Sequence, residues 1–179
     1  MKRVGKYCLK YFNGFSLKGE EILFSEYLVQ SELCVAGFSY GAQQALEYVL
    51  KSSKRVDRLI LLSPAFFQNH KASFIRAQLR YFKAGKDAYV EQFLKNVTYP
   101  AEEDLSSCLN IGTEEELETL LGYVWEEEKL RQIKERGTVI EVFLGGKDKI
   151  IDALSALDFF APLSTTYFIK NAGHLLKLP

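Results

Sequence analysis

Ser39 lies at the centre of the pentapeptide Gly37-Phe38-Ser39-Tyr40-Gly41. A serine held in a tight turn between a strand and a helix needs small residues two positions away on either side, because a Cβ there would collide with neighbouring backbone. A serine exposed in this way can attack carbonyl carbon atoms. The pattern predicts that Ser39 is a nucleophile that forms covalent acyl intermediates.

The sequence on either side of Ser39 agrees with this prediction. Residues 33–36 form a short apolar run suited to a buried strand, and apolar residues recur at helical spacing directly after the pentapeptide. The helical positions are Ala42, Ala45, Leu46, Val49 and Leu50. The alternative is a glycine-flanked serine in an ordinary turn between a strand and a helix, so the prediction also needs a base and an acid elsewhere in the chain.

Only two histidines, His70 and His174, could act as the base. His174 follows a predicted strand and a glycine, which favours a loop at the carboxyl edge of a parallel sheet, where ligands bind in such folds. His70 lies where a helical segment begins and is interpreted as a surface residue. His174 is therefore the predicted base.

A carboxylate must orient the histidine and stabilise its charged form during attack. Asp148 follows a predicted strand within Gly145-Gly146-Lys147-Asp148, and Asp152 is the second candidate. Either aspartate could instead be a helix N-cap or a solvated loop charge. With Asp148, the three candidate residues occur in the order Ser, Asp, His.

An anionic intermediate at Ser39 also needs hydrogen-bond donors fixed in advance. The backbone N–H of Tyr40, at the start of the helix after Ser39, is one predicted donor. The loop of residues 13–15 after the first strand supplies the second, the backbone N–H of Phe15.

Alternating strands and helices are expected to position these groups, which predicts an α/β fold with a mostly parallel sheet. The expected strands span residues 7–12, 33–36, 56–62, 138–144 and 165–169. Helices are expected at 19–30, after Ser39 and at 150–160. A wholly helical segment, with stretches at 71–84, 86–96 and 113–135, predicts a cap of residues 68–136 inserted into a core of residues 1–67 and 137–179.

Composition limits the class of protein. The chain has 179 residues, of which 47% are hydrophobic, and its 23 basic residues balance its 23 acidic ones. This balance predicts neither a nucleic-acid nor a membrane partner. Without a recognisable signal peptide, the widely spaced Cys8, Cys34 and Cys108 are expected to be reduced thiols in a cytoplasmic protein, and neither a metal nor a cofactor is expected.

The chain resembles the α/β-hydrolase superfamily over nearly its whole length. The resemblance rests on residues 13–15, the pentapeptide around Ser39, residues 61–65, residues 145–148 and Ala172-Gly173-His174. It looks most like the esterases that cleave pimeloyl-acyl-carrier-protein methyl ester in biotin synthesis. It departs from its relatives by lacking two strands before the first loop and a helix after His174, and by having Asn13 where relatives often have histidine, so a minimal α/β-hydrolase fold is expected.

A basic helix face suggests how such a substrate would dock. Arg76, Arg80 and Lys83 share one face at about 100° per residue, and Phe74, Ile75, Tyr81 and Phe82 are expected on the other. The resemblance implies an acidic acyl carrier protein as the partner, docking on Arg76, Arg80 and Lys83. These residues could equally be a solvated helix face, and a general short-chain carboxylesterase, an acyl thioesterase or a non-catalytic binding protein on this scaffold remain alternatives.

Overall fold

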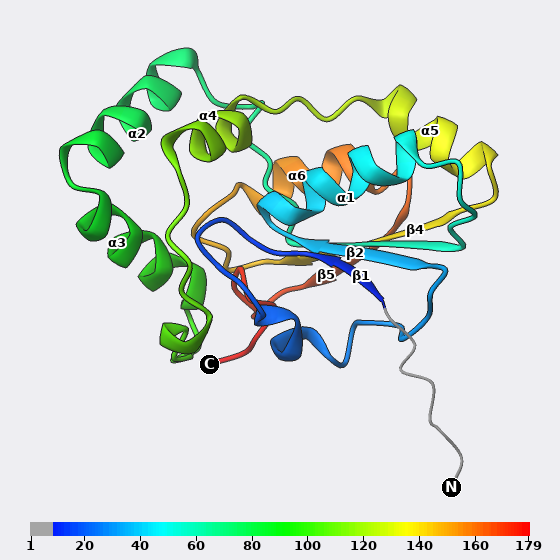
Figure 1. Cartoon of the computed structure of the whole chain (residues 1–179), viewed down its shortest axis with the longest axis horizontal. Coiled ribbons are helices and arrows are strands. Elements are labelled where there is room, and N and C mark those ends of the chain that lie inside the picture. The colour runs from blue at the N-terminus through cyan, green and yellow to red at the C-terminus, as the bar shows by residue number, and fades with distance from the viewer. Residues whose placement is uncertain (1–8) are drawn as a thin grey trace, which may run out of the picture.

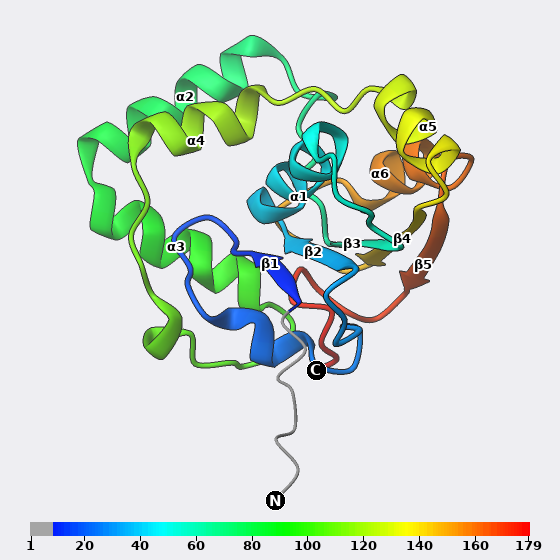
Figure 2. The same ribbon diagram turned by 45° about the vertical axis from the view of Figure 1, so that its right-hand side comes forward.

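A five-stranded parallel sheet forms the centre of the protein. The computed structural model describes residues 9–179, so Tyr7 and Cys8 of the first predicted strand lie outside the described residues. The strands pair in chain order, and all five are labelled in the second view (Figures 1 and 2). They are β1 (Lys10–Phe12), β2 (Cys34–Phe38), β3 (Arg58–Leu62), β4 (Val139–Gly145) and β5 (Thr165–Ile169).

Three helices cover one face of this sheet. These are α1 (Tyr40–Lys51), α5 (Glu127–Glu135) and α6 (Ala153–Phe160), which lie on the same side of the strands in both views (Figures 1 and 2). Because crossovers between parallel strands are right-handed, the successive connections from β2 to β5 bring these three helices to a single face. The predicted α/β class with a parallel sheet flanked by helices is confirmed.

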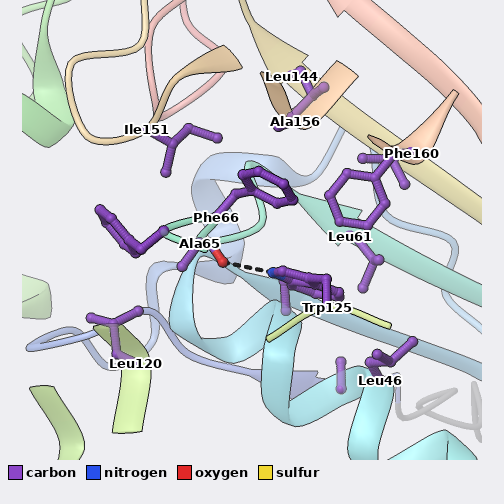
Figure 3. Packing of buried hydrophobic residues seen from close by; sticks show 14 of the residues in the cluster. Leu46, Leu61, Ala65, Phe66, Leu120, Trp125, Leu144, Ile151, Ala156 and Phe160 are labelled. Atoms are coloured by element: carbon purple, nitrogen blue, oxygen red, sulfur yellow. Dashed lines mark hydrogen bonds between the residues drawn. The ribbon is translucent and has the colours of Figure 1, made fainter. Parts of the chain in front are cut away.

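Alternate strand residues form the core on this face. Leu59, Leu61 and Val142 pack against apolar side chains of α1, α5 and α6. Trp125 belongs to this cluster, where its Nε1 donates a hydrogen bond of 2.8 Å to the Ala65 carbonyl oxygen. Figure 3 shows this bond and the neighbouring Phe160.

The opposite face is covered by short or irregular segments. Ile60, Leu62 and Phe38 pack there against Phe24 and Leu175. The predicted helix over residues 19–30 is wrong, since only a 3-10 helix, η1 (Glu20–Phe24), forms. Phe24 is drawn into the core against Phe38, with ring centroids 4.7 Å apart, and its carbonyl oxygen accepts hydrogen bonds from two following backbone N–H groups that close a turn.

Between β3 and β4 the chain forms the predicted helical segment. The helices α2 (Ala72–Ala84) and α3 (Lys86–Thr98) confirm the stretches predicted at 71–84 and 86–96, and η2 (Ser106–Cys108) follows. The continuous helix predicted over 113–135 is wrong. It is divided into α4 (Glu114–Gly122) and α5, because residues 123–126 run extended. This extended path places the Trp125 side chain in the core, on the face of the sheet that the helices cover.

Within the inserted segment α4 packs beside α2. The segment contacts the core through α5, which packs on α1 and β4. The boundaries of the cap remain a prediction. Among residues 9–179, no helix combines the length and the apolar character needed to span a bilayer.

Candidate active site

Ser39 lies in a strained turn between β2 and α1. Its backbone has φ 53° and ψ −112°, a combination that a non-glycine residue rarely adopts and that occurs at functional turns. A methyl group on Gly37 would overlap the carbonyl oxygen of Gly41, and one on Gly41 would overlap the carbonyl oxygen of Phe12. Both glycines are therefore required by backbone packing, as the sequence predicts.

The structure brings Ser39, His174 and Asp148 into contact. The distance from Ser39 Oγ to His174 Nε2 is 2.9 Å, and that from His174 Nδ1 to Asp148 Oδ2 is 2.6 Å. Ser39 is 2% exposed and the His174 and Asp148 side chains are 0% exposed. A serine hydroxyl, an imidazole and a carboxylate in this order form a relay in which the imidazole can take the hydroxyl proton while the carboxylate fixes its tautomer.

Each partner of Ser39 is held by further hydrogen bonds. Asp148 Oδ1 accepts from the backbone N–H groups of Ile150 and Ile151, at 2.7 and 3.1 Å, which leaves Oδ2 directed at the imidazole. The buried Ser63 hydroxyl donates to the His174 carbonyl oxygen at 2.6 Å. The acid and the base are therefore fixed by the loops after β3, β4 and β5.

The two alternative residues have other partners. Asp152 is the N-cap of α6, where its Oδ1 accepts from the backbone N–H groups of Leu154 and Ser155, and it is exposed. These bonds and the Ser155 hydroxyl lower the pKa of Asp152, with the side-chain bond the largest cause. His70 is half-buried and stacks on Phe74 with ring centroids 4.1 Å apart. It is therefore not the fully solvated surface residue that the sequence suggested.

The predicted oxyanion donors lie on either side of the serine turn. Tyr40 is the first residue of α1, and Phe15 lies in the loop after β1. Within residues 9–179 neither backbone N–H has a hydrogen-bond acceptor, whereas the neighbouring Ser39 N–H donates to the Leu62 carbonyl oxygen. A cavity beside the loop is lined by both residues, together with Gly14 and Gln44.

Several residues that support the site have no signature in the sequence. Gln43 is buried and its Nε2 donates to the carbonyl oxygens of Ala65 and Leu120, at 3.0 Å each, which ties α1 to α4. Ser63 supports His174, and the buried Glu20 lies under the loop after β1. A buried polar residue differs from a surface one by its tertiary surroundings, which local sequence patterns do not contain.

A large cleft opens between α2, α3, α4 and the loop that carries Asp148. Its volume is about 940 Å³, and most of its walls are apolar and aromatic. The apolar lining includes Phe67, Phe74, Phe93, Leu120, Ile150 and Ile151. Asp148 also borders this cleft, so an apolar group bound there would lie beside the relay.

The basic face of α2 is partly neutralised. Arg76 and Arg80 are exposed, as expected, but Lys83 Nζ lies 2.8 Å from Glu114 Oε1 at the start of α4. This bond to Glu114 raises the pKa of Lys83. Tyr81, expected on the packed face, is 56% exposed and lines the cleft, so that prediction is wrong.

Residues 9–179 hold no cluster of three histidine, cysteine or acidic side chains arranged for a metal ion.

Comparison with known proteins identifies the fold. No protein-family model matches the chain, and no curated protein matches its sequence. The structure is similar to the carboxylesterase CesB from Bacillus subtilis, with a TM-score of 0.62 and 16% identity over 94% of this chain and 77% of that one. It is also similar to MenH from S. aureus, with a TM-score of 0.59 and 14% identity over 93% and 84%.

A third similar structure is E-2-(acetamidomethylene)succinate hydrolase, with a TM-score of 0.60 and 13% identity over 94% of this chain and 86% of that one. At such identities the likeness concerns the fold. The chain has the α/β-hydrolase fold in a minimal form, as its sequence predicts.

Proposed function

We propose that the protein is a serine hydrolase that cleaves carboxylic esters. The observation that carries this proposal is the buried relay, in which His174 lies 2.9 Å from the Ser39 hydroxyl and 2.6 Å from Asp148. Binding alone gives no reason to bury these three polar side chains in mutual contact, whereas acyl transfer requires each of them.

The proposed reaction has two steps. Ser39 Oγ attacks the ester carbonyl carbon while His174 Nε2 takes the hydroxyl proton, and the resulting oxyanion accepts hydrogen bonds from the Phe15 and Tyr40 N–H groups. The carbon–oxygen bond to the alcohol breaks as His174 returns the proton to the leaving oxygen. Water, deprotonated by His174, then cleaves the acyl-enzyme to release the acid and restore Ser39.

The direct test is Ser39→Ala. We expect ester hydrolysis to fall by about 10⁴-fold or more, because both steps lose the nucleophile. A fluorophosphonate probe should label the unaltered protein and not the variant. Ser53→Ala, which changes an exposed serine, is the matched control. An active Ser39→Ala variant would contradict the proposal.

The cleft supports an apolar acyl group as the part of the substrate that binds. Each acyl methylene that these aromatic and aliphatic walls remove fully from water would strengthen binding by about 0.8 kcal/mol. We expect kcat/KM to rise from acetyl to octanoyl esters of one alcohol. Leu120→Asp, at the cleft wall, should reverse that preference.

The specific substrate that we propose is the methyl ester of pimeloyl-acyl-carrier protein, hydrolysed to methanol and the free acid in biotin biosynthesis. The resemblance of the sequence to esterases of this class supports it, as do the exposed Arg76 and Arg80 on α2, a helix that lines the cleft with its other face. Lys83 contributes less charge to this docking surface because it pairs with Glu114. A flexible acyl chain with few charges would also suit the apolar cleft.

Charge reversal tests the carrier. Arg76→Glu with Arg80→Glu should lower kcat/KM for the carrier-linked ester by about tenfold at low ionic strength, because complementary charge speeds association. The same variant should hydrolyse free dimethyl pimelate normally. Lys54→Glu, an exposed change at the other end of β3, is the control. Equal losses for both substrates would favour the alternative of a general short-chain carboxylesterase or thioesterase without a carrier.

A further inference from the structure

A carboxyl group is buried under the loop that follows β1. Glu20 is 0% exposed, and none of the ion pairs within residues 9–179 includes it. Burial raises the pKa of Glu20, and the hydrogen bond from the Gly14 N–H opposes that rise. A buried carboxyl without a cation lowers the stability of a fold relative to an apolar side chain of the same size. Its position therefore needs an explanation other than packing.

Glu20 holds one peptide group of the loop. Its Oε1 accepts a 2.6 Å hydrogen bond from the Gly14 N–H and a 3.3 Å bond from the Tyr11 hydroxyl. On the other side Gly14 is pressed against Phe38, because a methyl group on Gly14 would lie 2.7 Å from the ring. Asn13 Oδ1 accepts from the Gly19 N–H at 2.9 Å and closes the same loop.

The next peptide group contains the Phe15 N–H. Its carbonyl oxygen, that of Gly14, accepts a 3.2 Å bond from the Leu17 N–H. Because a trans peptide is planar, fixing this carbonyl also fixes the opposite direction of the Phe15 N–H. The two adjacent peptide groups are thus held in turn, the first by Glu20 and the second by the Leu17 turn.

We infer that Glu20 is a positioning residue that holds the loop so that the Phe15 N–H meets the oxyanion formed at Ser39. This inference rests on the proposed ester hydrolysis. Glu20 would stabilise the transition state rather than the bound ester. An ester carbonyl oxygen carries little charge before attack, so the Phe15 N–H forms a strong hydrogen bond only as the oxyanion develops. Loss of Glu20 should therefore lower kcat and leave KM nearly unchanged.

Two substitutions of nearly equal size isolate the hydrogen bond. Glu20→Gln keeps an oxygen that can accept from the Gly14 N–H, whereas Glu20→Met fills the same space without an acceptor. We expect kcat for a p-nitrophenyl ester to fall by about 30-fold in Glu20→Met, less than the loss of a whole oxyanion donor, and by less than threefold in Glu20→Gln.

A trifluoromethyl ketone separates this role from general support of the fold. Ser39 Oγ adds to the ketone carbon, His174 takes the proton and the carbonyl oxygen becomes an oxyanion, so its affinity reports on the donors directly. The affinity of Glu20→Met for the ketone should fall by the same factor as kcat. Thr138→Val, which removes a partly buried 2.6 Å bond at the other end of the sheet, should lower the melting temperature and leave kcat and ketone affinity unchanged.

NMR provides a test that does not require Glu20→Met to fold. In the unaltered protein the Phe15 amide proton should shift downfield when the ketone adds, and the Gly14 amide proton should move upfield in Glu20→Gln as it loses a carboxyl acceptor. A Phe15 amide that does not respond to the ketone would overturn the inference.

Equal losses of kcat in both Glu20 variants would also overturn it, as would unchanged kcat and ketone affinity in folded Glu20→Met. The failure of the proposed function has a different signature. In that case the unaltered protein would hydrolyse no ester and its Ser39 would not react with fluorophosphonate.

Discussion

The two halves of the site are built by different means. On the side of β4 and β5, Asp148 and His174 act through side chains that contact one another and Ser39. On the side of β1, the predicted oxyanion donors are backbone N–H groups, and the Glu20 side chain acts on them indirectly by accepting from the Gly14 N–H of the same loop. The side-chain half depends on residue identity, whereas the backbone half depends on the path of the chain, which several different sequences could produce.

The largest effect should come from the side-chain half. Asp148→Asn is expected to lower kcat by about 10⁴-fold, because an amide cannot stabilise the imidazolium or hold the required tautomer. Steady-state kinetics with a p-nitrophenyl ester measures this loss. Asp152→Asn, which keeps an acceptable N-cap, should change kcat by less than twofold. A large loss in the Asp152 variant alone would exchange the roles of the two aspartates.

A methyl group added to each half compares their rigidity. Gly173→Ala would push a Cβ into the Tyr99 carbonyl oxygen, so the His174 loop must shift, and about 100-fold of kcat should be lost. Gly14→Ala meets the ring of a side chain, Phe38, rather than backbone, and about tenfold should be lost. Gly122→Ala, with open space around it, is the control. A greater loss in Gly14→Ala would reverse the comparison.

Ser63 tests how firmly the histidine loop is held. Ser63→Ala removes the 2.6 Å bond to the His174 carbonyl oxygen and leaves this buried acceptor without that donor. We expect the free energy of unfolding to fall by about 1–2 kcal/mol and kcat to fall by less than tenfold, measured by urea denaturation and ester hydrolysis. Unchanged stability would indicate that water replaces the hydroxyl.

The pH dependence of stability should reveal the buried carboxyl of the backbone half. The pKa of Glu20 is raised in the folded protein by burial. Its contribution to stability is therefore greatest below the unfolded value, about 4.3, and is lost as the pH rises through the folded value. Relative to Glu20→Gln, which does not titrate, the unaltered protein should become less stable from pH 4 upward. A constant difference between their urea midpoints would contradict this.

The sequence predicted the side-chain half more completely than the backbone half. The pentapeptide around Ser39 and the strand-to-loop positions of Asp148 and His174 follow from steric needs and residue types, which local sequence contains. All five strands were expected, and four of the five are described over most of their predicted length.

The errors arise where tertiary contacts determine the local conformation. Burial of Phe24 ends η1 after five residues, and burial of Trp125 divides α4 from α5. Tyr81 lines a cleft that forms only when α2, α3 and α4 are assembled. In the helix predicted over residues 19–30, Glu20 would be an ordinary acidic residue of the first turn. Only the tertiary structure shows that its side chain is buried.

The strand pairing of β3 with β4 has a consequence for how such proteins diversify. The two strands pair directly, although the chain between Leu62 and Val139 carries four α-helices. The entropy of closing a loop grows only with the logarithm of its length, so doubling this insertion would cost about 0.6 kcal/mol. Evolution can therefore lengthen, shorten or exchange the walls of the cleft at a small free-energy cost, while the reacting groups stay on the turns and loops that follow strands of the sheet.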